Sequence, residues 1–465
     1  MQYVSSRGEA PILGFSDAML AGLARDGGLY LPEAWPQIAP AEIRAIASQP
    51  FHEAAYRVLR PFVGEEIDAD TFAGLIREAY SGFRHAAVAP LVQTGPNSWL
   101  LELFHGPTLA FKDIAMQLLG RLMDHVLNER GRRATIVGAT SGDTGSAAIE
   151  AFRGRANVDV FILYPHGRVS AVQRRQMTTV AEGNVHALAV EGNFDDCQSL
   201  VKAMFNDHGF RDRFALSGVN SINWARIMAQ IVYYFTAAAS LGAPKRAVSF
   251  CVPTGNFGDI FAGYAAKRMG LPVDRLIIAT NENDILARTL ATGRYETHKV
   301  VATTSPSMDI QVSSNFERLL FEASGRDAGQ VRRLMDGLAQ SGAFSLPAAM
   351  LGQIREDFDA GSASEIESAQ AIRNLRETSG YLADPHTAVG AHVAGRIAPS
   401  SPTITLATAH PAKFPDAVKA ACGIKPQLPQ WLGDLMERPE RFEVVANDLA
   451  AVESLIAQKA VARTA

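Results

Sequence analysis

This sequence predicts an α/β fold in which open, mostly parallel sheets covered by helices form two domains, next to a largely helical N-terminal region. From residue 99 onward, short runs rich in apolar and β-branched residues alternate with helical stretches, which is the pattern of parallel sheets. The 465 residues exceed what one hydrophobic core organises, so more than one packed unit is expected. We place an N-terminal domain at 1–90, a smaller α/β domain at 91–235 and a larger one at 236–465.

The composition excludes several classes of protein. Apolar residues make up 47% of the chain and charged residues 20%, and the net charge of -4 argues against a nucleic-acid-binding protein. The three cysteines lie far apart without paired spacing, so we expect neither a disulfide framework nor a Cys-based zinc site, and a reducing cytoplasm fits best. We find no secretion signal and no run of eighteen apolar residues, so we expect no membrane span.

The expected elements follow from hydrophobic spacing. In the N-terminal region, residues 41–63 and 68–83 have the apolar spacing of amphipathic helices. Beyond it, continuous apolar runs indicate buried strands, and the segments after them have helical spacing. Because ligands of open α/β sheets bind beyond the carboxyl ends of strands, chemistry is expected in the loops that follow strands. The expected strands are 132–140, 158–165, 184–192, 246–255 and 274–282, and the helices include 144–154, 169–181 and 258–270.

Lys112 is the first candidate functional residue. It follows the turn His105-Gly106-Pro107-Thr108 and stands among apolar neighbours at the start of a helix. Desolvation and the positive end of the helix disfavour an ammonium there, which lowers the pKa of the amine and suits it to Schiff-base chemistry. The alternative is a lysine that extends to the surface from the first helical turn.

Two loops that lead from a strand into a helix are candidate anion sites. In the first, Thr140, Ser141, Gly142, Asp143 and Thr144 offer hydroxyl groups and unpaired N–H groups at a helix start. An ordinary capped turn explains the same residues equally well.

The second loop, 253–259, has the sequence PTGNFGD and resembles a phosphate cup. No Lys-Ser/Thr pair follows it, and neither loop has the G-x-G-x-x-G spacing, so nucleotide and dinucleotide binding are disfavoured. Glycines that only permit close packing of helix and strand are the alternative.

Taken together, these motifs resemble those of the threonine synthases, which belong to the tryptophan-synthase-β-like family of pyridoxal 5'-phosphate (PLP) enzymes of fold type II. The motifs HGPTLAFKD at 105–113, TSGDTG at 140–145, PTGNFGD at 253–259 and ATAHPAKF at 407–414 occur in the family's order. The segments YVSSRG, LARDGGLYLPE, SINWARI and SPSMDIQVSSNFERL are also similar, so the resemblance covers most of the chain. The part after Lys425 is less informative.

The resemblance implies a role for each matched residue. Lys112 would hold PLP as a Schiff base, and Thr408 would bond the pyridine nitrogen as a neutral partner. Asp143 stands where related enzymes often have asparagine near the cofactor's 3′-oxygen, which makes its role harder to transfer. The cofactor phosphate would be bound by the backbone N–H groups of Gly255, Asn256, Phe257 and Gly258, and Asp259 would belong to the cofactor site. The substrate carboxylate would be bound by Thr140, Ser141, Gly142 and Thr144, and the substrate phosphate by Ser221, Asn223, Arg226 and Lys413.

Two of these assignments have structural alternatives. Arg226 is either a phosphate ligand or an ion-pair partner within a helix. His410, in the last motif, is either a proton carrier or a core histidine whose hydrogen bonds are satisfied. Eleven histidines occur without HExxH or similar spacing, so we expect no catalytic metal.

The implied reaction converts O-phospho-L-homoserine and water into L-threonine and phosphate, by elimination at Cγ and replacement at Cβ. A PLP-dependent phospholyase or dehydratase that gives a 2-oxo acid is the alternative within the family. A non-catalytic PLP-binding protein is the alternative from another class. We expect a small-molecule substrate, no nucleic-acid or membrane partner, and a monomer or homodimer in the cytoplasm.

Overall fold

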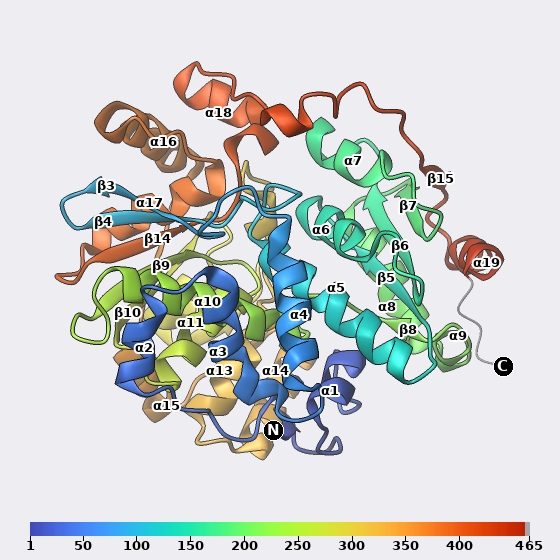
Figure 1. The fold of residues 1–465 in the computed structure, drawn as a ribbon, viewed down its shortest axis with the longest axis horizontal. Coiled ribbons are helices and arrows are strands. Elements are labelled where there is room, and N and C mark those ends of the chain that lie inside the picture. The colour runs from blue at the N-terminus through green and yellow to red at the C-terminus, as the bar shows by residue number, and fades with distance from the viewer. Residues whose placement is uncertain (461–465) are drawn as a thin grey trace.

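The computed structural model describes residues 1–460, in which two sheet-centred halves stand beside a helical N-terminal region (Figure 1). Residues 461–465 of the expected last domain lie outside the described part. The larger half contains a six-stranded sheet that is parallel except for its last strand, β3, which pairs antiparallel with β4. The strands, in spatial order, are β13 (Phe358–Ser362), β10 (Val273–Thr280), β9 (Val248–Pro253), β14 (Thr403–Ala407), β4 (Ser98–Glu102) and β3 (Leu91–Gly95).

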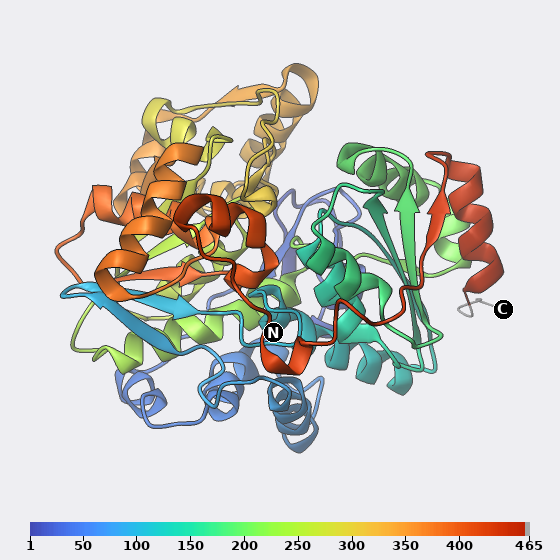
Figure 2. The same ribbon diagram turned by 90° about the horizontal axis from the view of Figure 1, so that it is seen from above.

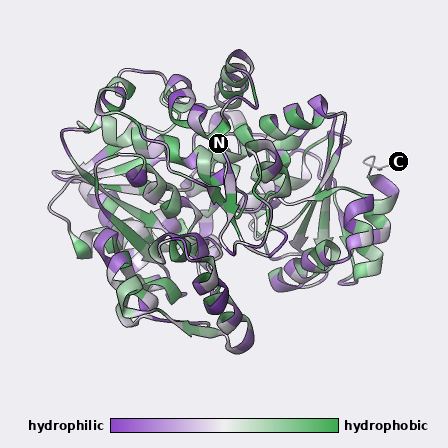
Figure 3. Cartoon of the chain, turned by 90° about the horizontal axis from the view of Figure 1, so that it is seen from below, coloured by the Kyte–Doolittle hydropathy of each residue, from purple (hydrophilic) through white to green (hydrophobic). Residues whose placement is uncertain are grey.

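The smaller half contains a five-stranded parallel sheet. Along its strands, alternate side chains join different cores: Ile136 packs into the large central core, and Val137 packs under α8 and α19. Figure 3 shows the strands of both halves as predominantly hydrophobic, which agrees with sheets buried on both faces. The strands, in spatial order, are β15 (Glu443–Val445), β7 (Val185–Val190), β6 (Val158–Pro165), β5 (Ala134–Ala139) and β8 (Leu216–Ser217).

Helices cover both faces of each sheet. The five-stranded sheet carries α5 (Lys112–Glu129), α6 (Asp143–Phe152) and α7 (Ala171–Thr178) on one face, and α8 (Phe194–Asn206), α9 (His208–Arg213) and α19 (Leu449–Lys459) on the other. The larger half contains α10 (Trp224–Ser240), α11 (Gly258–Arg268), α12 (Ile285–Thr292), α13 (Phe316–Ala323), α14 (Ala328–Ser341), α15 (Ala348–Asp357), α16 (Glu365–Ser379), α17 (Pro385–Ile397) and α18 (Pro415–Cys422).

The N-terminal region is helical, as expected, with one addition. The short strands β1 (Tyr3–Ser5) and β2 (Tyr30–Pro32) pair antiparallel, which the sequence did not indicate. The helix α3 packs against α10, and α4 packs against α5, so this region supports both α/β halves. Its helices are α1 (Phe15–Ala21), α2 (Pro40–Ile46), α3 (Phe51–Val63) and α4 (Ala69–Ser81).

The remaining short elements lie in connections. They are the antiparallel pair β11 (Arg294–Glu296) and β12 (Ala343–Ser345), and the single turns η1 (Pro306–Met308), η2 (Pro411–Lys413) and η3 (Gln430–Leu432). Each of the five expected strands is present, and no helix within residues 1–460 is both long and apolar enough to cross a bilayer.

Strand pairing differs from the expected division of the chain in two places. The strands β3 and β4 lie within 91–235 but pair in the sheet of the larger half. The strand β15 and the helix α19 lie within 236–465 but complete the smaller half, as Figure 2 shows where the red chain crosses from one half to the other. Hydrophobic spacing identifies a strand without naming its partner, so sequence order was a poor guide at both ends of the α/β part.

Candidate active site

A cavity of about 2340 Å³ lies between the two halves. Its walls include the residues that follow β5, β9 and β14, so the loops beyond the carboxyl ends of both sheets meet there. This is the arrangement that the sequence predicted for the anion loops, and it brings Thr140, Gly255, Thr408 and Lys112 to one space.

Lys112 is the first residue of α5, and its side chain is buried at the cavity wall. The turn before it is held by Asp113, whose two carboxylate oxygens accept from the Thr108 N–H at 2.8 Å and the Thr108 hydroxyl at 2.6 Å. Burial lowers the pKa of Lys112, and the charges of Arg226 and Lys413 lower it further, against the opposing effect of Asp143. This direction agrees with the expectation for an amine nucleophile.

Asp143 begins α6 and lies between two lysines. Its Oδ2 is 3.7 Å from Lys112 Nζ, and its Oδ1 is 3.0 Å from Lys413 Nζ and accepts a hydrogen bond from Gln173 at 2.9 Å. Burial alone would raise the pKa of this carboxyl, but Lys413 and Lys112 hold it well below the usual range. Asp143 is therefore an anion that interacts with both lysines through its two oxygens.

The chain from Thr140 to Thr144 forms the turn into α6. The hydroxyl oxygen of Thr140 accepts from the N–H groups of Gly142 at 2.9 Å and Gly145 at 2.8 Å, which leaves its own proton free to donate. Gly142 has φ 140°, and a Cβ there would lie 2.4 Å from the Gln173 side chain. Ser141 and Thr144 line the cavity. The loop therefore presents hydroxyl groups and a helix N-terminus to the cavity, as an anion site requires.

The second anion loop follows β9. Phe257 takes the left-handed conformation at φ 63° and is anchored against Phe316 and Phe358, with ring centroids 5.4 and 5.8 Å away. A Cβ at Gly255 would lie 2.7 Å from the carbonyl oxygen of Ser307, so only glycine fits there. The first bond of α11 runs from Phe261 N to Phe257 O, so the N–H groups of 258–260 have no helical acceptor.

Thr408 directly follows β14, next to the lysine. Its carbonyl oxygen accepts a hydrogen bond from the N–H of Phe111 at 2.8 Å, which joins the lysine motif at 105–113 to the motif at 407–414. Its own N–H donates to the Thr387 hydroxyl at 3.3 Å, and Thr387 donates in turn to Asp384. The side chain of Thr408 is buried at the cavity wall and offers a neutral hydroxyl.

Two cavity residues were missed by the sequence reasoning. His386 is buried, with Nδ1 2.9 Å from Asp384 Oδ1, and its Nε2 accepts from the Ser307 N–H at 3.3 Å. Gln173 bonds Asp143 from α7. The pair Asp384-Pro385 has the pattern of a helix cap followed by a first-turn proline. That pattern predicts the start of a helix, but it does not show that the side chain of His386 lies at the cavity.

The four residues expected at the substrate phosphate separate into two pairs. Ser221 and Arg226 line the cavity, and Arg226 Nη1 donates to the Val219 carbonyl at 3.1 Å. The Nε of Arg226 is buried without a hydrogen-bond partner in the described chain, and burial lowers the pKa of its guanidinium to about 10. No carboxylate pairs with Arg226 within residues 1–460, so the structural ion-pair alternative lacks its partner.

Asn223 and Lys413 do not line the cavity, which differs from the expectation for them. Asn223 is fully buried, where it caps α10 through Ala225 N and donates to the Met19 carbonyl at 2.8 Å. Lys413 is fully buried, and its three donors reach Asp143, the Thr108 carbonyl at 2.6 Å and Gln176 Oε1 at 2.9 Å. With these donors occupied, both side chains position other groups and do not reach a substrate phosphate.

His410 lies outside the main cavity, in a smaller one near His105, Glu102 and Tyr381. Its Nδ1 accepts from the Ala412 N–H at 3.1 Å, and burial together with the charge of His105 lowers the pKa of the imidazole to about 4. It is a neutral core histidine at ordinary pH.

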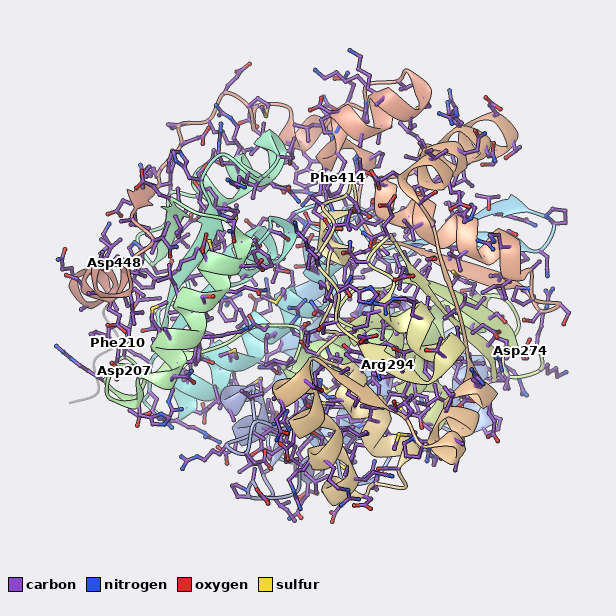
Figure 4. The ribbon with its side chains drawn as sticks, turned by 180° about the vertical axis from the view of Figure 1, so that it is seen from behind. Asp207, Phe210, Asp274, Arg294, Phe414 and Asp448 are labelled. Atoms are coloured by element: carbon purple, nitrogen blue, oxygen red, sulfur yellow. The ribbon has the colours of Figure 1, made fainter. Side chains whose placement is uncertain are left out.

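These groups fit pyridoxal phosphate. A buried lysine of lowered pKa, a glycine-bounded loop with unpaired N–H groups and a neutral hydroxyl face one cavity, and each matches one functional group of that cofactor. Phe414, labelled in Figure 4, marks the junction of the two halves beside this cavity.

Comparison with known proteins agrees with the site. Sequence models described as "Threonine synthase N terminus", "Pyridoxal-phosphate dependent enzyme" and "Threonine synthase, C-terminal" match residues 2–80, 87–409 and 387–456. The threonine synthase of Pseudomonas aeruginosa is 56% identical over 98% of both chains.

Two solved structures are also similar. The PLP-bound threonine synthase from Brucella melitensis is 65% identical, with a TM-score of 0.98, over 99% of this chain and 100% of that one. The yeast threonine synthase is 42% identical, with a TM-score of 0.93, over 98% of each.

Proposed function

Because the chain belongs to the threonine synthase family of PLP-dependent enzymes, we propose that Lys112 and the loops around it convert O-phospho-L-homoserine and water into L-threonine and phosphate. The fold is that of a type II PLP enzyme. The observation that carries the residue assignment is the buried Lys112 amine, which stands between a paired carboxylate and a phosphate-binding loop.

Lys112 serves as the covalent anchor and as the base. When bound, pyridoxal phosphate stores the electron pair that is released as the substrate's α-proton leaves. The lowered pKa of Lys112 makes its amine easier to deprotonate, so it can take up this proton, and then one from Cβ, as the phosphate leaves Cγ. The proton taken from Cβ is then returned at Cγ, which becomes the methyl group, before water adds its hydroxyl group at Cβ and a proton returns to Cα. We assign these transfers between carbon atoms to the same amine.

Asp143 stabilises the charged form of that amine. At 3.7 Å it is close enough to favour the ammonium whenever Lys112 holds a proton. Lys413 and Gln173 hold the carboxylate in place from the other side, so Asp143 does not collapse onto Lys112. Lys413 is accordingly assigned to positioning.

The anions of cofactor and substrate go to separate helix starts. The loop formed by Gly255, Asn256, Phe257 and Gly258 leads to the unpaired N–H groups at the start of α11, which suit the cofactor phosphate. Asp259 lies in the first turn of this helix. The hydroxyl groups and N–H groups of Thr140, Ser141, Gly142 and Thr144 suit the substrate carboxylate. The hydroxyl group of Thr408 would form a hydrogen bond with the pyridine nitrogen of the cofactor.

The substrate phosphate goes to Ser221 and Arg226. Arg226 is the buried cation of this wall, and its Nε has no partner in the described chain. A dianionic phosphate group satisfies both the charge and the unpaired donor. Asn223 supports this wall as the cap of α10.

The location of the protein in the cell is proposed from its composition. We keep the expectation of a cytoplasmic monomer or homodimer, which fits three cysteines without disulfide bonds. Light scattering of the purified protein at micromolar concentration decides between monomer and dimer.

The test is an assay with O-phospho-L-homoserine that follows phosphate and threonine together. Equal amounts of both, with the visible cofactor absorbance lost in Lys112→Ala and kept in the surface variant Lys267→Ala, are expected. Phosphate accompanied by 2-oxobutanoate would mean a phospholyase. An unchanged spectrum in Lys112→Ala would refute the lysine assignment.

A further inference from the structure

Asp259 is a buried carboxyl group directly behind the second anion loop. It is the second residue of α11, it lines the cavity, and only 7% of it is exposed. The hydroxyl of Tyr233 donates to Oδ1, and the hydroxyl of Tyr234 lies 3.0 Å from the same oxygen and 2.9 Å from the backbone carbonyl oxygen of Asp259. The other oxygen, Oδ2, is buried and has no hydrogen-bond partner in the described chain.

This pattern is that of a neutral carboxylic acid. A carboxylate has two accepting oxygens, whereas the protonated group has one accepting oxygen and one O–H donor. Asp113 provides the contrast within the same site, because each of its oxygens accepts a bond from Thr108. At Asp259 the donors converge on one oxygen, so the vacant oxygen is placed to carry a proton.

We propose that Asp259 is a neutral acid in the holoenzyme and that its Oδ2–H donates a hydrogen bond to the cofactor phosphate. The inference rests on the proposed function, since it requires the phosphate to lie at the start of α11. It adds a proton donor to a loop that otherwise offers only backbone N–H groups.

The charges at the site favour this state. A phosphate monoester carries about -1.5 to -2 charges at pH 7, so an ionised carboxylate beside it would be strongly repelled in a buried site. Burial already raises the pKa of Asp259 to about 6, although both tyrosines and Lys112 act to lower it. A bound phosphate raises this pKa further, so binding the cofactor takes up a proton.

Few other titratable groups face this carboxyl. Lys112 acts on it from α5, while α10 contributes Tyr233 and Tyr234, with Arg226 acting through Tyr233. The charged residues of α13 form hydrogen bonds with groups other than Asp259. Arg275 of the adjacent β10 pairs with Asp359. In α13, Glu317 bonds Ser6 and Arg7, Arg318 bonds Tyr30, Ile222 and Asn315, and Glu322 bonds Trp35 and Arg326.

The linkage has a definite sign. The protonated acid binds phosphate, so cofactor affinity falls as pH rises above the pKa of the free protein, by up to about tenfold per pH unit. Asp259→Asn keeps the acceptor for the tyrosines and offers an N–H donor without a titrating proton. The ratio of wild-type to Asp259→Asn dissociation constants for PLP is therefore expected to rise with pH between 6 and 9.

The deciding measurement is the infrared spectrum of the holoenzyme at pH 7.5. A C=O stretch of a protonated carboxyl that shifts in D₂O is expected in the wild type and in the control Asp113→Asn, and it should be absent in Asp259→Asn. A band that survives in Asp259→Asn, or that disappears in Asp113→Asn alone, would overturn the inference.

Two further outcomes keep the test decisive. If Asp259→Asn does not fold, Tyr233→Phe takes its place, because loss of the closest donor to Oδ1 must move the C=O band to higher frequency, and an unmoved band overturns the inference. If the wild type binds no PLP at all, the proposed function fails before the inference is reached.

Discussion

Three charged side chains are buried together at the site. Asp143 lies between Lys112 and Lys413, so a single carboxylate serves two ammonium groups. Ion pairs in such surroundings lose their hydration, and their members depend on each other. Lys413 also reaches the Thr108 carbonyl, so this cluster fixes the turn that precedes the catalytic lysine.

Lys413→Met is therefore expected to destabilise the protein by about 3–5 kcal/mol, the usual cost of breaking a buried ion pair, because it leaves Asp143 with only the more distant Lys112. Asp143→Asn in the same chain removes the orphaned charge, so the double variant should lose less than the sum of the single losses. Urea unfolding of the four proteins measures this coupling. Additive losses would show that the two side chains do not interact.

The pH dependence of the same variants adds an independent check. The pKa of Asp143 is lowered in the fold, so its pairing stabilises the protein above the ordinary range of aspartate, and that contribution is lost on acidification. Lys413→Met should flatten this acid-side slope of unfolding free energy. A slope equal to that of the wild type would contradict the assignment.

Arg226 is the second residue whose role can be isolated. Arg226→Gln removes a charge-assisted contact worth about 1.5–3 kcal/mol, so kcat/KM for O-phospho-L-homoserine should fall roughly 10- to 150-fold. The charge of Arg226 also lowers the pKa of Lys112, so its loss should raise that pKa and move the acidic limb of activity to higher pH. Steady-state kinetics across pH measure both effects.

Asn223→Ala is the matched control for this wall. It removes the cap of α10 and should cost about 0.5–2 kcal/mol of stability, with a smaller rise in KM than Arg226→Gln. If Asn223→Ala raised KM as strongly as Arg226→Gln, the assignment of Asn223 to capping would be wrong.

At the scale of elements, the site depends on how closely the segment 305–315 approaches the anion loop 253–259. The segment 305–315 packs on the phosphate loop, with the Ser313 hydroxyl donating to the Gly255 carbonyl at 2.6 Å and the Asn315 N–H donating to the Asn256 carbonyl. The position of the loop is thus set by a neighbouring segment as well as by its own strand and helix.

Gly255→Ala tests this approach. The new methyl group would meet a backbone carbonyl at 2.7 Å, which cannot rotate away, so the loop must move. We expect PLP to bind at least tenfold more weakly, as measured by absorbance titration. Gly352→Ala, in α15 with no atom within 4 Å, should stabilise its helix by about 0.5–1 kcal/mol and leave PLP affinity unchanged.

The elements differ in how far the sequence predicted them. Continuous apolar runs identified β5, β6, β7, β9 and β10, because buried parallel strands need apolar residues on both faces. The loops after β5 and β9 were identified because their small and hydroxyl-bearing residues follow predicted strands. The segment after β14 was identified only by its resemblance to the family's motif, since no strand was expected at 403–407.

The two expected phosphate ligands that do not line the cavity share one physical cause. Lys413 has the residue type of a phosphate ligand, but its donors are satisfied by Thr108, Asp143 and Gln176, which are distant in sequence. Asn223 likewise bonds Met19, 204 residues away. A single sequence shows the donor and not the partner that occupies it.

At the scale of the whole molecule, the end of the chain joins the two halves. After α18 in the larger half, the chain crosses to pair β15 with β7 and to pack α19 on α8 (Figure 2). On the way, Leu432 and Leu435 pack with Leu109 of the lysine turn and Val172 of α7. The far end of this crossing therefore stabilises the smaller half, which contributes the Thr140–Thr144 loop to the cavity.

Ile456→Ala separates the contribution of α19 from the stability of the molecule as a whole. Ile456 is fully buried against the five-stranded sheet, so the variant should cost about 2–5 kcal/mol. Ile366→Ala, on the exposed face of α16 with 80% of the side chain accessible, should change stability by less than about 0.5 kcal/mol. Hydrogen exchange should show the loss of protection in β6, β7 and α8 while β9 and β10 stay protected. An equal loss in both sheets would mean that the halves unfold as one cooperative unit.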